Sequence, residues 1–315
     1  MHKKYDVVVI GELNVDIILN NIENFPVIGK EIIAEDLIVT MGSSSAIFAC
    51  NLSTLGTKVV FIGKVGYDAF ANLMLDSLAT KKVDTSKIIK THTFNTGATI
   101  VLNYDQDRAN ITYPGAMNDL TINDIDFEVI SNAKHLHYSS YFLQPGLKKD
   151  VVLLFKKAKE LGLTTSIDPQ WDPFEKWDMS LEELLPFTDV FFPNKAEILA
   201  LTATDSIENA IHKIKHLSTI IAVKNGNEGA VGWNGQEIIY QKAFLNKKVV
   251  DCIGAGDSFN AGFIHEFINH HSVRDCLKFG ALTGAINTTE AGGTKAFEDI
   301  EKIRSIAKVV FNYQF

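Results

Sequence analysis

Short apolar runs rich in β-branched residues alternate with amphipathic stretches along most of the chain, and this alternation constrains the fold more than any other feature. Strands that are apolar throughout are buried on both faces, and helical crossovers between them imply a parallel sheet covered by helices on each side. The sequence therefore predicts an α/β fold. The expected strands lie at 5–10, 58–62, 135–138, 164–167, 190–192 and 219–223, and the expected helices at 44–55, 68–79, 151–161, 194–201 and 207–217.

Two regions interrupt the alternation. Residues 17–40 look like two extended segments around the turn Asn24-Phe25-Pro26, and residues 97–113 look like a hairpin with 105–107 at its tip. Together they could form a small separate sheet, either a lid or an edge extension of the main sheet. Because no linker rich in Gly, Ser or Pro divides the chain, we expect a single domain over residues 1–315.

Composition and charge exclude several classes of protein. With 46% hydrophobic and 22% charged residues, the 315-residue chain is typical of a globule rather than of a disordered protein. Its net charge of −8 argues against nucleic acid or an anionic membrane as a partner. We interpret the lysine pairs at 81–82, 148–149, 156–157 and 247–248 as solvated faces. The three distant cysteines form no metal pattern, and with neither a secretory signal nor a membrane span expected, we predict a cytoplasmic protein.

The C-terminal third is mostly helical, at about 255–269, 273–289 and 299–311, and it begins with the segment DCIGAGDSFNAGF, residues 251–263. A glycine-rich turn before a helix lets backbone N–H groups converge on an anion, and Asp257 falls in the first turn of that helix. The alternative is that Asp257 merely caps the helix. Neither a P-loop nor a dinucleotide-binding fingerprint occurs in the chain.

The segment DCIGAGDSFNAGF resembles the C-terminal signature of the PfkB, or ribokinase-like, carbohydrate kinases. Further motifs that resemble the family follow its expected order: GELNVD at 11–16, GSSSA at 42–46, FIGKVGYDAF at 61–70, PNKAE at 193–197 and KNGNEG at 224–229. The resemblance spans essentially the whole chain. It implies a three-layer αβα domain, with a mostly parallel central sheet and a small β-sheet lid formed by about 12–40 and 97–113.

The resemblance also implies roles for individual residues. Asp257 matches the catalytic base, which accepts the proton of a sugar hydroxyl, and Gly254, Ala255 and Gly256 match the anion hole. Glu197 would organise Mg²⁺, more through water than directly. The residues implied in nucleotide binding are Asn194, Lys224, Gly226, Gly229 and Asn287.

On the sugar side, the implied contacts are Asn14, Asp16, Gly42 and Ser43. The chain departs from the family here, because many members have a Gly-Gly pair and then an Asn where this chain has Ile47. Asp251 matches a residue near a monovalent-cation site, which makes K⁺ activation an open alternative. Arg108 could meet an anionic substrate or simply face water.

Together these features predict an ATP- and Mg²⁺-dependent kinase that phosphorylates a hydroxymethyl group of a small sugar, a ketose or a pentose. A nucleoside kinase is the alternative within the same fold, and Ile47 and Phe48 would be compatible with a base. A non-catalytic sugar or nucleotide sensor is the alternative from another class. The implied partner is a small molecule, and relatives in the family suggest a homodimer through the lid.

Overall fold

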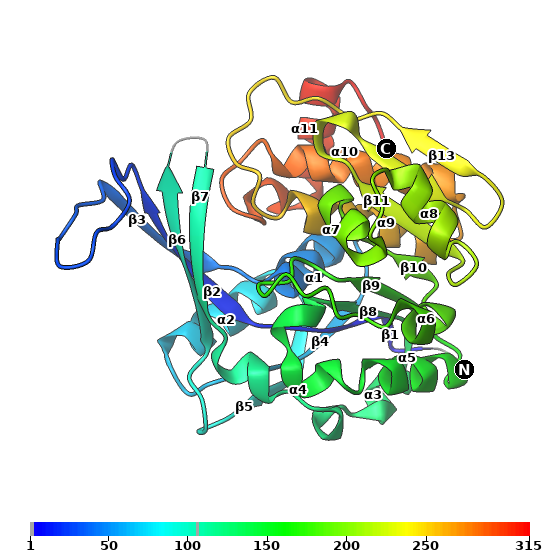
Figure 1. Cartoon of the computed structure of the whole chain (residues 1–315), viewed down its shortest axis with the longest axis horizontal. Coiled ribbons are helices and arrows are strands. Elements are labelled where there is room, and N and C mark those ends of the chain that lie inside the picture. Colours follow the sequence, from blue (N-terminus) through cyan, green and yellow to red (C-terminus); the bar gives the residue numbers. More distant parts are fainter. Residues whose placement is uncertain (1–2, 105–106) are drawn as a thin grey trace.

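The computed structural model describes residues 3–104 and 107–315, which build a large sheet, its covering helices and a small projecting sheet (Figure 1). The large sheet has the order β13-β12-β11-β10-β9-β8-β1-β4-β5. Its strands are β1 (Tyr5–Ile10), β4 (Val59–Val65), β5 (Asp84–Lys90), β8 (Ala133–Ser139), β9 (Thr164–Asp168), β10 (Val190–Phe191), β11 (Ile220–Lys224), β12 (Ala230–Trp233) and β13 (Ile238–Gln241).

Neighbouring strands from β5 to β11 pair in parallel, while β12 and β13 are antiparallel at one edge. All six strands predicted from apolar runs are confirmed, within a few residues at their ends. The edge strands β5 and β13, and β12 next to β13, were not among them. The carboxyl ends of the parallel strands therefore meet along one edge of the sheet, where ligands bind in folds of this class.

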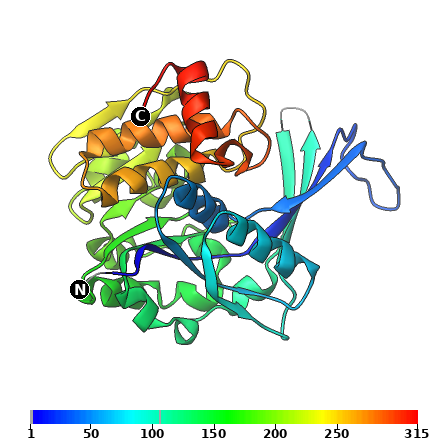
Figure 2. The ribbon, with the colours of Figure 1, turned by 180° about the vertical axis from the view of Figure 1, so that it is seen from behind.

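Helices cover both faces of the sheet because successive strand residues point to opposite sides. In β1, Val8 and Ile10 pack with one layer, and Val7 and Val9 pack with the other. The first layer contains α3 (Phe127–Ser131), α4 (Pro145–Lys148), α5 (Val151–Glu160), α6 (Leu181–Leu184), α7 (Lys195–Thr202) and α8 (Ile207–Ile214). The second contains α1 (Ser44–Thr54), α2 (Ala69–Thr80), α9 (Ala255–Ile268) and α10 (Val273–Asn287), and it faces the viewer in Figure 2.

The last helix, α11 (Ile300–Phe311), packs on the side of α10 that faces away from the sheet. Phe279, Leu282 and Ile286 of α10 form a third apolar cluster there with Ile303 and Ala307. The three-layer αβα architecture predicted for the chain is confirmed.

The small sheet stands apart from the main body and has the order β3-β2-β6-β7 (Figure 1). Its strands are β2 (Asn14–Asn20), β3 (Asp36–Met41), β6 (Gly97–Tyr104) and β7 (Asp107–Tyr113). The β2–β6 pair is parallel and the two outer pairs are antiparallel. The hairpin prediction is confirmed, although residues 105–106 of its tip lie outside the described residues. The turn predicted at 24–26 lies within a longer loop, residues 21–35, that joins the two extended segments β2 and β3.

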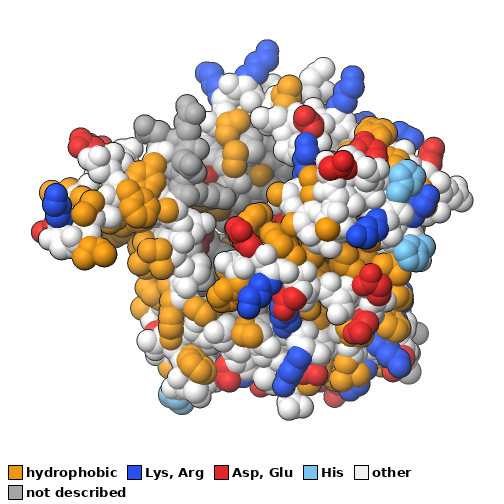
Figure 3. All heavy atoms as spheres, in the orientation of Figure 1, with side chains coloured by type: hydrophobic (Ala, Val, Ile, Leu, Met, Phe, Trp, Pro, Cys, Tyr) orange, Lys and Arg blue, Asp and Glu red, His pale blue; other side chains and the backbone are white. Residues whose placement is uncertain are grey.

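The two faces of the small sheet differ in chemistry. Strand register puts mostly polar side chains on the face toward the main body, among them Asn14, Asp16, Thr99 and Thr112. The opposite face is apolar and carries Val15, Ile17, Leu19, Leu37, Val39, Met41, Ala98, Ile100, Leu102, Ala109, Ile111 and Tyr113. Hydrophobic side chains also gather on the projecting lobe at the left of Figure 3, where Phe25, Ile28 and Ile33 of the long loop are exposed.

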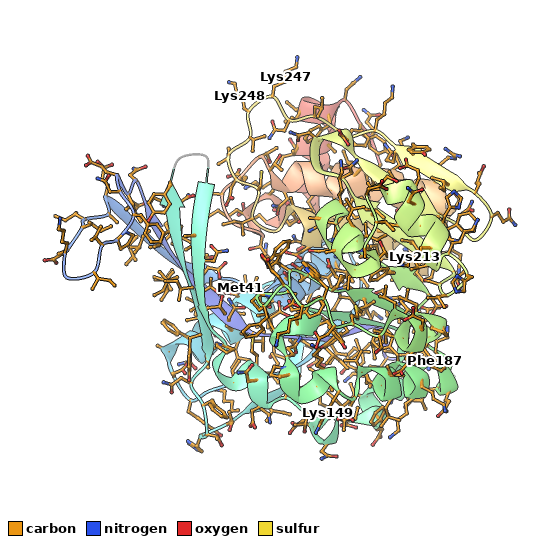
Figure 4. All side chains as sticks on the ribbon, in the orientation of Figure 1. Met41, Lys149, Phe187, Lys213, Lys247 and Lys248 are labelled. Carbon is orange, nitrogen blue, oxygen red and sulfur yellow. The ribbon has the colours of Figure 1, made fainter. Side chains whose placement is uncertain are left out.

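The lysine pairs are largely solvated, as predicted. Lys149, Lys247 and Lys248 are exposed and point away from the body (Figure 4). Lys81 is the exception, because its ammonium is half-buried and donates to the carbonyl groups of Phe297 (2.7 Å) and Glu298 (3.0 Å). Among the described residues, no helix has the length and apolar character needed to span a membrane.

Candidate active site

A cavity of 480 Å³ lies at the carboxyl edge of the large sheet and extends to the polar face of the small sheet. Its walls come from loops that follow strands of the large sheet, from the starts of helices, and from the strands β2, β6 and β7 of the small sheet. The lining residues are Glu12, Asn14, Asp16, Ser43, Ser44, Ile47, Thr99, Val101, Asn110, Thr112, Ser140, Leu143, Gln170, Trp171, Asn194, Glu197, Lys224, Cys252, Ile253, Gly254, Gly256 and Asp257.

A second cavity of 240 Å³ adjoins the first. Lys224, Cys252 and Gly256 line both cavities, so the two meet at the start of α9. Gly226 and Gly229, both predicted nucleotide contacts, line the second cavity, as do the apolar residues Val249, Phe244, Phe259, Ala281 and Ala285. The arrangement can hold two ligands whose ends face each other across the α9 N-terminus.

The turn before α9 is built around Gly254, which has a φ of 76°. A side chain there would meet Gly293 and Ile47, so only glycine fits both the backbone conformation and the space. The Ile47 side chain lies against this turn. It stands at the position for which the family resemblance had suggested an asparagine that bonds the sugar. Gly256 lines both cavities, whereas the Ala255 N–H donates to the Cys252 carbonyl at 3.2 Å. Ala255 would have to leave that bond to join an anion hole.

Asp257 lies in the first turn of α9, and its carboxyl group is buried. Burial, and next the negative charge of Asp168, raise the pKa of Asp257 to about 8. The side-chain amide of Gln170 donates to Asp257 Oδ1 at 3.3 Å. The alternative that Asp257 only caps α9 does not explain why its carboxyl group lines the large cavity. A carboxyl group with a pKa near neutrality can accept a proton from a bound hydroxyl.

A buried ion pair lies beside Asp257. The Lys224 ammonium at the end of β11 donates to Asp168 Oδ2 at the end of β9, and Asn260 of α9 donates to the same oxygen at 2.6 Å. Burial lowers the pKa of Lys224, but the charges of Asp168 and Glu197 outweigh this effect and hold it above its ordinary value. Lys224 therefore stays charged at the junction of the two cavities.

Asn194 and Glu197 form a reciprocal capping box at the start of α7. The Asn194 N–H donates to Glu197 Oε2 at 2.8 Å, and the Glu197 N–H donates to Asn194 Oδ1 at 2.9 Å. Both residues also line the large cavity, and Glu197 is almost fully buried. Burial and the charge of Asp168 raise the pKa of Glu197 to about 7. The pair caps the helix and faces the site at once.

The sugar-side residues predicted after the first strand also reach the large cavity. Asn14 Nδ2 donates to Asp16 Oδ1 (3.2 Å) and to Thr99 Oγ1 (3.1 Å), which joins β2 to β6. A side chain at Gly42 would collide with the Asp16 carboxylate, so glycine is required there. Ser43 lines the cavity, but its hydroxyl donates to the Glu12 carbonyl (2.6 Å) and accepts from the Ala46 N–H (3.0 Å).

Two further predicted residues, Asn287 and Asp251, make hydrogen bonds within the protein. Asn287 is fully buried and does not line the second cavity: its amide donates to the Ile253 carbonyl at 2.6 Å and accepts from the Ser258 hydroxyl at 3.0 Å. Asp251 accepts from the N–H groups of Ile253 (2.9 Å) and Gly292 (2.8 Å), so it ties two loops together. The side chain of Arg108 lies outside the described residues.

Several residues that line the cavity or contact its lining were not predicted. Asp168 and Gln170 come directly after an expected strand, where the carboxyl-edge rule could have found them. Glu12 lies inside the GELNVD motif, is buried, and accepts from the Ser45 hydroxyl and N–H. Burial raises its pKa. Asn260 lies inside DCIGAGDSFNAGF, but its contact with Asp168 joins distant parts of the chain and could not be predicted from the motif.

The described residues hold no cluster of three or more His, Cys, Asp or Glu side chains that could chelate a metal by themselves. Mg²⁺ often uses one or two carboxylates together with water and substrate phosphates. Glu197, which faces the large cavity from α7, fits that kind of site.

Comparison with known proteins agrees with this geometry. An uncharacterised sugar kinase from Archaeoglobus fulgidus is 30% identical over 74% of this chain and 92% of that protein. An ATP-dependent 6-phosphofructokinase from Thermoanaerobacterium thermosaccharolyticum is 25% identical over 96% of this chain and 94% of its own. The crystal structure of adenosine kinase from Sinorhizobium meliloti superposes with a TM-score of 0.81 at 25% identity, covering 92% of this chain and 95% of that one.

The family predicted from the segment DCIGAGDSFNAGF is confirmed at the level of the whole domain. Residues 4–300 match the pfkB family carbohydrate kinase. The chain therefore belongs to the pfkB family of carbohydrate kinases, and it is an ATP-dependent phosphotransferase.

Proposed function

We propose that this kinase transfers the γ-phosphoryl group of ATP to a hydroxymethyl group of a small sugar, with Asp257 as the general base. The observation that carries the proposal is the buried Asp257 carboxyl beside Gly256, where the two cavities meet. In this proposal the sugar occupies the large cavity, next to Asn14 and Asp16. The nucleotide occupies the smaller one, with its phosphates toward α9.

The smaller cavity suits a nucleotide. Its apolar residues, such as Phe244 and Phe259, would pack against the base, and the glycines of the 226–229 turn allow close approach of the phosphates. Mg²⁺, when bound with ATP, supplies charge that neutralises the phosphates. Glu197 would hold it through water, and Asn194 would orient Glu197 through the capping box.

The catalytic step needs a hydroxyl, a base and charge stabilisation in one place. Asp257 accepts the hydroxyl proton as the oxygen attacks the γ-phosphorus, and the bond from phosphorus to the bridging oxygen of ADP breaks. The N–H groups at the start of α9 and the Lys224 ammonium hold the negative charge that spreads over the transferred group. Gln170, through its bond to Oδ1, orients the Asp257 carboxyl toward the hydroxyl.

Replacement of Asp257 by Asn tests this assignment. The amide cannot accept the proton, so kcat should fall by at least about 10²-fold, while ATP binding stays nearly intact. ADP release would be measured with Mg-ATP and a panel of ketoses, aldoses and nucleosides, and ATP binding by calorimetry. Asp76→Asn, an exposed carboxylate on α2, is the matched control. Wild-type turnover in Asp257→Asn would overturn the role of Asp257.

We extend the proposal to the small sheet, which would act as a lid over the large cavity. Thr99, Asn110 and Thr112 of its polar face line that cavity, so closure would exclude water from the acceptor. The apolar face on the other side would pack against the same face of a second copy. Leu37, Val39, Ile100, Ile111 and Tyr113 are exposed there, and an antiparallel sheet open to water on one side normally carries polar residues on that side.

A further inference from the structure

The loop that follows β9 carries Trp171, an aromatic residue that has no role in the proposed reaction. Trp171 lines the large cavity at its rim, directly after Gln170, and 49% of its surface is exposed. An isolated exposed aromatic side chain needs no explanation by itself. Trp171 differs because the chain around it is built to hold its ring in one orientation.

Two features fix the ring. The buried carboxylate of Asp172 accepts three backbone N–H groups of the same loop, from Phe174 (2.9 Å), Lys176 (2.8 Å) and Trp177 (2.7 Å). Trp177 then packs edge-on against Trp171, with ring centroids 4.9 Å apart and planes at 89°. The indole of Trp171 is therefore braced from one side while it borders the cavity on another.

The loop maintains this arrangement against backbone strain. Gln170, Glu175 and Trp177 have φ values of 58°, 52° and 53°, in the left-handed region that residues other than glycine rarely adopt. Such conformations persist where the surroundings over-determine them, and they gather at ligand sites. Gln170 links the strained loop to the chemistry, because its side chain donates to Asp257.

The charge of the cavity restricts what can lie on the ring. Carboxyl groups from Glu12, Asp16, Glu197 and Asp257 border the cavity. Among the described lining residues the one amine is that of Lys224, which is already paired with Asp168. A carboxylate or phosphate on the acceptor would lie among these acidic groups and would repel each of them that is ionised, and such pairing of like charges is a common means of rejecting a ligand.

We infer that the acceptor is an uncharged, ring-closed sugar whose C–H face packs against the indole of Trp171 while its hydroxyl groups bond to the Asn14 and Asp16 side. The inference rests on the proposed function and narrows it to one substrate class. An indole offers a broad apolar face with negative electrostatic potential, which attracts polarised C–H groups. A nucleoside presents the same kind of sugar with a base attached, so it becomes one arm of the test.

The test compares Trp171→Ala and Trp171→Phe with wild type. Phe174→Ala is the matched control, because Phe174 lies in the same loop, is 76% exposed and does not line the cavity. For the best neutral sugar, Trp171→Ala should raise KM by at least about tenfold, with kcat changed less than about threefold. Trp171→Phe should lie between, and KM for ATP should not change. In wild type, the sugar should also alter tryptophan fluorescence, and Trp171→Phe should lose that signal.

Each outcome decides the inference. A preference for sugar acids or sugar phosphates over neutral sugars would overturn it, as would an unchanged KM in Trp171→Ala. A nucleoside that outperforms the free sugar, with an advantage that Trp171→Ala removes, would also overturn it, because the base and not the sugar would then pack against the indole. Failure of the proposed function would look different, because a neutral sugar would then change the fluorescence of Trp171 without any ADP being formed.

Discussion

At the scale of single residues, the site buries the carboxyl group of Asp257, and this burial lowers the stability of the folded protein when the group is ionised. Asp257 is buried near Asp168 and Glu12, and both carboxyl groups raise its pKa, after burial itself. A surface Asp would be ionised at all ordinary pH values but would be a weak base. The chain thus places a stronger base at the reacting hydroxyl at the expense of stability, since ionising a buried carboxyl disfavours the folded state.

This cost predicts a pH-dependent gain in stability for Asp257→Asn. The pKa of Asp257 is about 8 in the folded protein and 3.8 as the ordinary value, so between these pH values the folded state holds a proton that the unfolded chain has lost. Wild-type stability therefore falls as pH rises through this window, and the amide removes that dependence. The free energy of unfolding of the variant, relative to wild type, should rise by about 2–3 kcal/mol from pH 5.5 to pH 8.5.

Urea unfolding of both proteins at the two pH values measures the difference. The raised pKa of Glu197 is present in both proteins and cancels in the comparison to first order. A variant whose advantage is the same at pH 5.5 and pH 8.5 would show that Asp257 titrates in its ordinary range.

At the scale of elements, the sequence predicted what local pattern controls. Buried parallel strands such as β1 and β4 are mostly apolar runs that can be predicted from the local sequence. The edge strand β5 is half-exposed and mixes polar and apolar residues, and β12 and β13 are short, so their pairing depends on neighbours that the local sequence does not reveal. The positions of the motifs predicted which loops meet at the site, because these loops follow strands whose carboxyl ends lie along the same side of the sheet.

What sequence could not supply was the direction of side chains on helices. Gly284 and Ala285 of α10, and Thr288 directly after it, line the nucleotide-side cavity, whereas Asn287 is buried away from it. Adjacent helix positions differ by about 100° around the axis. A motif match to within one residue therefore does not tell a ligand contact from a core hydrogen bond.

The next prediction concerns Asp168 of β9, which accepts from Lys224 of β11 and Asn260 of α9 and so joins these three elements. Lys224→Met would leave Asp168 buried without its cation, and we expect the free energy of unfolding to fall by about 3–5 kcal/mol. Adding Asp168→Asn should recover at least about half of that loss, because the pair is then removed together. Urea unfolding of the two single variants and the double variant gives the coupling.

The half-exposed pair Lys159–Asp189, 2.7 Å apart, is the matched control, and Lys159→Met should cost no more than about 1 kcal/mol. Equal losses in Lys224→Met and Lys159→Met would show that the buried pair does not hold the strand ends together. Independent, additive effects of Lys224→Met and Asp168→Asn would lead to the same conclusion.

At the scale of the whole molecule, the two faces of the projecting sheet have different surroundings. Its polar face completes the large cavity, while its apolar face is in part buried, at Val15 and Met41, and in part exposed, at Leu37, Val39 and Ile111. Single exposed apolar residues are normal, but a contiguous apolar sheet face marks a site of association. A second copy is the simplest occupant, because a two-fold axis would bring the same apolar face of both subunits together.

A dimer formed this way should be lost when the face is charged. We expect the wild-type protein to sediment as a dimer at micromolar concentration, and Ile111→Glu, at an exposed position of the face on the edge strand β7, to sediment as a monomer. Thr112→Glu, the next residue of β7 on the opposite face, is the control, and it should leave the dimer intact while weakening sugar binding. Because each lid would be braced by its partner, the Ile111→Glu monomer should also hydrolyse ATP faster in the absence of sugar, through poorer exclusion of water. A monomeric wild-type protein, or a dimer that persists in Ile111→Glu, would place the interface elsewhere.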